Sequence, residues 1–127
     1  MPSISELSRD GFWYLASPYS DPSPDVRVYR AACVVIAAGD LAKKELPVYS
    51  PIASWHIASG VRDLPTDADW WRKINLPFMQ KAKGLIVLTL DGWKDSKGVR
   101  MEMEYFAAYE DEPHFLDPIL MELVPRP

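Results

Sequence analysis

The stretch Gly84-Leu85-Ile86-Val87-Leu88-Thr89-Leu90 is the clearest strand in the sequence. A continuous apolar run of this length is typical of a strand that is buried on both faces, as the strands of parallel sheets are. A polar loop over residues 91–98 follows this run, and we expect a helix from Val99 to about Tyr109 after it. The predicted fold is therefore built outward from this strand.

The rest of the sequence continues the alternation of strands and helices. Ahead of the central run we expect strands over residues 12–16 and 47–52, helices over residues 25–41 and 67–82, and one or two helical turns over residues 53–60. Pro77 should kink the second helix or split it in two, and a last strand is expected over residues 118–124. Crossovers of this length suit parallel pairing, so we predict an α/β three-layer sandwich with a mostly parallel sheet of four to five strands.

A chain of 127 residues is long enough to bury one core. We expect a single domain over residues 1–127, with residues 1–10 as a flexible N-terminal extension. The first residues include acidic side chains and lack the apolar segment of a signal peptide, and no run approaches the roughly 18 apolar residues that cross a bilayer. The single cysteine, Cys33, cannot form an internal disulfide. These features predict a cytoplasmic protein without membrane contact.

The net charge of −4 and the isoelectric point near 5.1 argue against one class of partner. Proteins that coat nucleic acid attach through a surface rich in Lys and Arg that neutralises phosphates. A small anion is still compatible, because backbone amides at a helix start can hold one phosphate without net positive charge. We find no side-chain spacing that suggests a metal site.

In a mostly parallel α/β sheet the ligand binds at the carboxyl ends of the strands, where the loops 17–24 and 91–98 are expected. Ser96 is a plausible N-cap, and Gly98 lets the backbone approach a ligand, so the helix start forms an anion pocket. Glu102 follows about one turn into the helix. Two interpretations stay open: a carboxylate beside the pocket that takes part in sugar-phosphate chemistry, or Glu102 and Glu104 as solvated acids favoured by the helix dipole.

Two segments resemble the signature segments of the nucleoside 2-deoxyribosyltransferase-like superfamily: Tyr14-Leu15-Ala16-Ser17-Pro18-Tyr19, and Gly92-Trp93-Lys94-Asp95-Ser96-Lys97-Gly98-Val99 followed by Glu102. The resemblance covers residues 12–108. It is closest to a small bacterial and phage branch related to the 2′-deoxynucleoside 5′-monophosphate N-hydrolases. It implies a Rossmann-like or flavodoxin-like fold, no cofactor, and cleavage or transfer at an N-glycosidic bond of a nucleoside or deoxynucleotide.

By position, the resemblance assigns the catalytic roles. Glu102 matches the glutamate that attacks the anomeric carbon and forms a covalent glycosyl-enzyme, and Tyr14 matches the tyrosine that hydrogen-bonds this carboxylate. Asn75 stands where the superfamily has an aspartate, and an amide carries no titrating proton. Asp67 and Asp69 lie upstream on the same predicted helix as possible substitutes.

The resemblance also implies the substrate-binding residues. Those that hold the 5′-phosphate or border the sugar and base are Ser96, Gly98, Ser17, Pro18 and Tyr19. We add Trp93, which lies in the loop beside the pocket, with ligand contact, subunit contact and simple packing all open for it. Superfamily members usually assemble so that a neighbouring subunit completes the site, and we expect a homo-oligomer, a dimer or tetramer, here also.

Asn75 keeps alternatives to the enzyme open. A nucleotide-binding or sensing module that kept the pocket but lost turnover is one, and a structural or interaction protein with a vestigial pocket is another. For the remaining candidates the ordinary interpretation is preferred: His56 as a satisfied histidine, Cys33 as an inert core residue, and Arg27 and Arg30 as solvated surface.

Overall fold

The computed structural model describes residues 1–127. The five strands are β1 (Trp13–Ala16), β2 (Val48–Tyr49), β3 (Leu85–Leu88), β4 (His114–Leu116) and β5 (Leu123–Val124). The four α-helices are α1 (Pro24–Lys43), α2 (Pro51–Arg62), α3 (Ala68–Lys81) and α4 (Lys97–Ala107), and short 3-10 turns lie at Ile4–Glu6 and Trp93–Asp95. No helix is long and apolar enough to cross a membrane.

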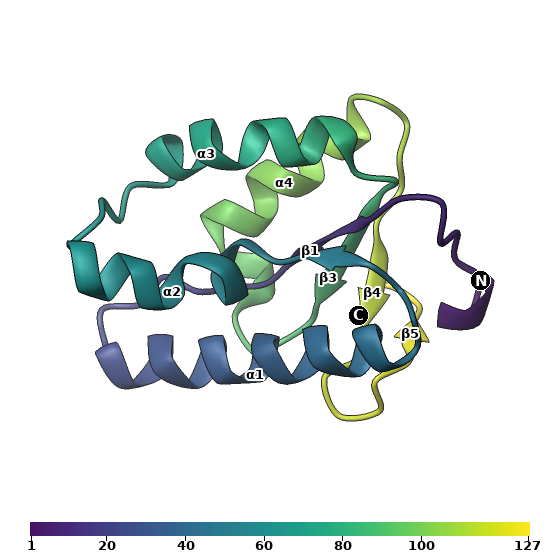
Figure 1. The fold of residues 1–127 in the computed structure, drawn as a ribbon, viewed down its shortest axis with the longest axis horizontal. Coiled ribbons are helices and arrows are strands. Elements are labelled where there is room, and N and C mark those ends of the chain that lie inside the picture. The colour runs from purple at the N-terminus through teal and green to yellow at the C-terminus, as the bar shows by residue number, and fades with distance from the viewer.

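The strands form one sheet in the order β2-β1-β3-β4-β5. The first three pairings are parallel, and β5 runs antiparallel to β4. Figure 1 shows α1 along one side of the sheet and α3 with α4 on the other. The predicted α/β three-layer sandwich of the Rossmann-like type is confirmed.

Side chains of alternate residues in β1 and β3 build the two cores. Leu15 and Ile86 pack on the α1 side, and Tyr14 and Val87 pack on the side of α3 and α4. All residues of both strands are buried. The continuous apolar run in the sequence therefore reflects a strand covered on both faces, as predicted.

The connections reverse direction between β1 and β3. From β1 the chain passes through α1 to β2 at one edge, whereas from β3 it passes through α4 to β4 on the other side. Such a reversal opens a crevice at the carboxyl ends of the two adjacent strands, where α/β proteins bind their ligands. The loop after β1 and the start of α4 both lie at this point.

Pro77 does not split α3, one of the two outcomes expected from the sequence, because the helix runs unbroken from Ala68 to Lys81. A proline in a helix leaves the carbonyl four residues earlier without its backbone donor. That residue is Lys73, and both Lys73 and Pro77 are exposed. Water can therefore satisfy the unpaired carbonyl, which removes much of the cost of the proline.

The C-terminal region also differs from the prediction. Only Leu123–Val124 of the expected strand 118–124 is a strand, and β4 was not predicted. Residues between them form a turn in which the Asp117 carboxylate accepts hydrogen bonds from the amides of Ile119 and Leu120, each at 2.8 Å. β4 has only three residues, too few for a hydrophobic period, and its pairing with β3 defines it.

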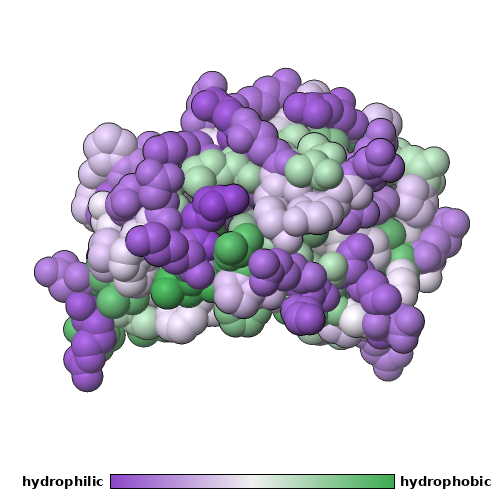
Figure 2. All heavy atoms as spheres, turned by 90° about the horizontal axis from the view of Figure 1, so that it is seen from above, coloured by the Kyte–Doolittle hydropathy of each residue, from purple (hydrophilic) through white to green (hydrophobic).

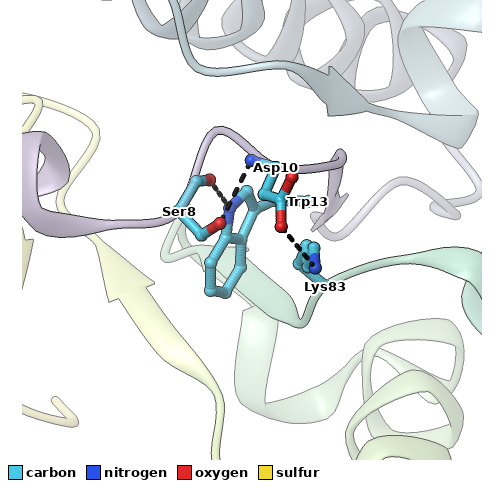
Figure 3. Close-up of polar contacts among 4 residues, drawn as sticks. All are labelled: Ser8, Asp10, Trp13 and Lys83. Carbon is cyan, nitrogen blue, oxygen red and sulfur yellow. Dashed lines mark hydrogen bonds and ion pairs between the residues drawn. The ribbon is translucent and has the colours of Figure 1, made fainter.

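The first ten residues, expected as a flexible extension, pack against the domain instead. Ile4 and Leu7 are buried in the core on the α1 side. Figure 3 shows the end of this segment, where the Trp13 indole donates to the Ser8 carbonyl at 2.9 Å and Lys83 pairs with Asp10 at 3.6 Å. Two isolated apolar residues gave no periodic signal in the sequence, so only the tertiary contacts reveal their role.

Candidate active site

Glu102 lies on the inner face of α4, because Val99 one turn before it and Phe106 one turn after it are both buried. The Ser96 hydroxyl accepts a hydrogen bond from the Val99 amide at 3.2 Å and so caps the start of this helix. Glu104, two residues on, is exposed. The interpretation of both glutamates as solvated acids therefore holds for Glu104 alone.

The Glu102 carboxyl group is surrounded by protein although the residue as a whole keeps partial exposure. This burial raises the pKa of Glu102 from the ordinary 4.5 to about 7, and the Tyr14 hydroxyl acts in the opposite direction. Burial disfavours the charged form of a carboxyl group, whereas a hydroxyl donor favours it. Glu102 therefore changes its charge close to neutral pH, which suits a carboxylate used in chemistry.

The Tyr14 side chain lies beside the Glu102 carboxyl group. It is completely buried, and burial followed by the negative charge of Glu102 raises the pKa of the Tyr14 hydroxyl far above its usual range. The hydroxyl has no partner within full hydrogen-bond geometry, so its interaction with the carboxylate is a near contact in this conformation. The rings of Tyr49 and Phe106, at 5.6 and 6.1 Å, hold Tyr14 in place.

Asn75 belongs to a hydrogen-bonded network beside these two residues. It is 7% exposed, and its Oδ1 accepts from the Tyr49 hydroxyl at 2.9 Å. The Trp55 indole N–H donates to the same hydroxyl at 3.0 Å. Burial raises the pKa of Tyr49, and the charge of Glu102 adds to that rise, so the network and the carboxylate share one environment.

Aromatic rings enclose this network. Tyr49 stacks on Phe78 with ring centroids 3.9 Å apart, and Trp55 lies 6.2 Å from Trp71. Trp70 meets Trp71 edge to face at 4.9 Å. Together these five rings form a wall contributed by β2, α2 and α3, which we call the aromatic wall.

The loop after β1 carries three of the predicted binding residues. Ser17 and Pro18 are buried, and the Ser17 hydroxyl has no hydrogen-bond partner. Tyr19 is partly exposed and shares a hydrogen bond of 2.6 Å with Nδ1 of His56 on α2. His56 is thus a satisfied histidine, as the sequence suggested, and it ties α2 to this loop.

Arg30 joins the loop after β1 to the loop after β3, a role that the sequence did not reveal. Its guanidinium donates to the Ser20 carbonyl at 3.0 Å and to the Asp91 carbonyl at 3.3 Å. A Cβ at Gly92, where φ is +90°, would lie 2.6 Å from this guanidinium. Glycine at that position therefore serves both the backbone conformation and the close approach of Arg30.

The predicted binding residues in and after the loop 91–98 differ in exposure. Ser96 is partly exposed and Gly98 is exposed, and a Cβ at Gly98 would meet only the Ser96 hydroxyl, at 3.9 Å. Trp93, predicted as a substrate contact, is buried instead and packs 5.4 Å from Phe115 in the core. The 3-10 turn directs its indole inward, so packing is the correct one of the three interpretations left open.

Sequence reasoning missed Tyr49, Trp55 and Phe78. Tyr49 ends a two-residue strand and Trp55 lies in the stretch read as one or two helical turns, so no motif marked them. The upstream acids do not replace the missing carboxylate, since Asp67 and Asp69 are exposed at the start of α3, where Asp67 caps the helix. No three His, Cys, Asp or Glu side chains are placed to hold a metal ion.

The fold and the site define an α/β domain with a mostly parallel sheet, in which a helix carries a buried carboxyl group beside a buried tyrosine of the central strand β1. Residues 11–116 match the family described as a domain of unknown function, DUF1937, and the chain belongs to this family. The matched range includes Glu102, Tyr14 and Asn75. No curated protein matches the chain.

Proposed function

We propose that this protein cleaves or transfers the N-glycosidic bond of a nucleoside or deoxynucleotide through Glu102. The observation that carries the proposal is the Glu102 carboxyl group, held beside the buried Tyr14 hydroxyl of β1 with a pKa of about 7. The resemblance of residues 14–19 and 92–102 to the nucleoside 2-deoxyribosyltransferase-like superfamily supports it. The aromatic wall supplies flat apolar surface on which a base can stack.

In the proposed reaction a Glu102 oxygen forms a bond to the anomeric carbon as the bond from that carbon to the base nitrogen breaks. The electron pair leaves with the base, which takes up a proton from water. Water or a second base then attacks the anomeric carbon and releases the Glu102 carboxylate. Tyr14 orients the attacking carboxylate, and the free amides at the start of α4, near Ser96 and Gly98, face a 5′-phosphate.

The test is release of free base from a panel of nucleosides and 5′-deoxynucleotides, followed by chromatography. Wild type should release base from at least one member, Glu102→Ala should release none, and Glu104→Ala should behave as wild type because Glu104 is exposed. Glu104 is the matched control on the same helix. Absence of base from every substrate, or equal activity of Glu102→Ala, would contradict the proposal.

The rate of base release should depend on pH through Glu102. Only the carboxylate attacks, so kcat/KM should rise with a midpoint near pH 7 and level off above pH 8. At pH 6 it should be about tenfold below the plateau. In Tyr14→Phe the midpoint should move to higher pH, because the Tyr14 hydroxyl lowers the pKa of Glu102. A midpoint near 4.5 would show that the carboxylate is not in this environment during catalysis.

Asn75 favours a second candidate function, nucleotide binding without turnover. The amide occupies the position of the expected second carboxyl group and is already bonded to Tyr49. A thermal-shift screen separates the two functions: stabilisation by a nucleotide without base release supports binding alone. No stabilisation by any nucleotide would leave the pocket vestigial.

We also propose that the protein assembles as a homo-oligomer in the cytoplasm. Large apolar side chains are exposed on α1 and α2, among them Val28, Val35, Ile36, Ile57 and Val61. Figure 2, which views the side of α3, shows mostly hydrophilic residues with smaller hydrophobic patches between them. Apolar surface on α1 and α2 supports a contact between copies there.

A further inference from the structure

The hydrogen-bond chain at Asn75 has a fixed direction. The indole N–H of Trp55 can only donate, so the Tyr49 hydroxyl accepts from it at 3.0 Å. That hydroxyl has one proton, which it donates to Asn75 at 2.9 Å. The atom of Asn75 that faces Tyr49 in the structure is the carbonyl oxygen, Oδ1.

This direction determines what Asn75 offers to a ligand. With Oδ1 bound to Tyr49, the amide nitrogen Nδ2 is left with two N–H donors. Nδ2 donates no hydrogen bond within the protein, and it is not among the buried polar atoms that lack a partner, so solvent reaches it. Asn75 therefore offers donors, where a carboxylate would offer only acceptors.

The surroundings of Asn75 indicate which part of a ligand it meets. Its partner Tyr49 is stacked on Phe78, and the ring of Trp55 packs near that of Trp71. The amide therefore lies at the edge of the aromatic wall. A planar ring stacked on the part of the wall beside Asn75 would have its edge groups within reach of Nδ2. The edge of a base carries either carbonyl oxygens, which accept, or amino groups, which donate.

We propose that Asn75 determines specificity by selecting bases with a carbonyl group over bases with an amino group at the same position. Trp55 and Tyr49 are positioning residues, because they hold the amide in the donating orientation. The inference rests on the proposed function for the class of ligand, a nucleoside or nucleotide.

The experiment measures the affinity of the full chain for two pairs of 5′-deoxynucleotides by calorimetry: the uracil and cytosine compounds, and the hypoxanthine and adenine compounds. Within at least one pair, wild type should bind the carbonyl compound about tenfold more tightly, the scale of one hydrogen bond gained against one lost. Asn75→Asp should reverse this preference, since a carboxylate accepts from the amino group.

Trp55→Phe provides a second variant that keeps the aromatic ring. It removes the donor that orients Tyr49, so the hydroxyl can turn, the amide can flip, and the preference should fall to within about threefold. Tyr109→Phe is the control, because Tyr109 is 67% exposed and lies outside both the aromatic wall and the hydrogen-bond chain, and its preference should stay that of wild type. If Asn75 or Trp55 had a merely structural role, its substitution would lower the affinity for all four nucleotides by the same factor.

The outcomes separate this inference from the proposed function. Equal affinity within both pairs, or an unchanged preference in both Asn75→Asp and Trp55→Phe, overturns the inference even if base is released. A uniform loss of affinity in Asn75→Leu without a carbonyl preference in wild type would place the acceptor on the sugar and overturns it also. A carbonyl preference without base release supports the inference while the enzymatic function fails. No binding of any of the four nucleotides overturns the inference, whereas the proposed function fails only if no member of the nucleoside and deoxynucleotide panel releases base.

Discussion

Glu102→Gln should lose turnover and gain stability at the same time. Removing a covalent nucleophile should lower turnover by at least about a thousandfold. The same change should raise the free energy of unfolding above pH 7, since glutamine keeps the shape of the side chain without the charge that burial disfavours. The gain should reach at most about 3 kcal/mol at pH 8, because each pKa unit corresponds to about 1.4 kcal/mol.

The sign of the pH dependence follows from the direction of the pKa shift. Folding raises the pKa of Glu102 from 4.5 to about 7, so the folded state binds more protons between these values. The stability associated with protonated Glu102 is complete below about pH 4.5 and is lost as the pH rises through about 7. The difference in the free energy of unfolding between Glu102→Gln and wild type should therefore grow mainly between pH 4.5 and about 7.

Urea unfolding of wild type, Glu102→Gln and Glu104→Gln at pH 4.5, 6 and 8 measures this effect. Glu104 is exposed, so its variant should follow wild type at each pH. A difference between Glu102→Gln and wild type that does not change with pH would show that the carboxylate is not buried in the folded protein. If Glu102→Gln retained turnover, Glu102 would not be the nucleophile.

Phe106→Ala should cause the largest loss of stability, about 3–5 kcal/mol. Phe106 is 2% exposed and packs against Tyr14 and Tyr105, with ring centroids at 6.1 and 5.3 Å. Deleting the ring leaves a cavity behind the tyrosine that adjoins Glu102. The substitution should therefore loosen the site as well as the core.

Tyr109→Ala is the control for this prediction, because Tyr109 follows the same helix but is 67% exposed. It should change the free energy of unfolding by no more than about 0.5 kcal/mol. Phe106→Leu, which keeps most of the apolar volume, allows base release to be measured in a folded protein. A loss below 1 kcal/mol for Phe106→Ala in urea unfolding would contradict the packing described for α4.

The parts of the fold that were predicted correctly have strong local signals. The apolar run 84–90 predicted β3 because both of its faces are covered, and Ser96 predicted the start of α4 because its hydroxyl caps the Val99 amide. β4 has only three residues and Ile4 is an isolated apolar residue, so neither has a local period to read. Their positions follow from pairing and burial against distant segments.

The sequence by itself determined the α/β class and the order of its main elements, because the spacing of apolar residues reflects whether an element is buried on one face or on two. It also singled out Glu102, Tyr14 and Asn75 through their place in recognisable segments. Only the tertiary structure decided that Trp93 is core, that Arg30 joins the two loops, and that Trp55 and Tyr49 orient Asn75. These contacts join residues far apart along the chain, and the direction of a hydrogen bond depends on which donors and acceptors meet in space.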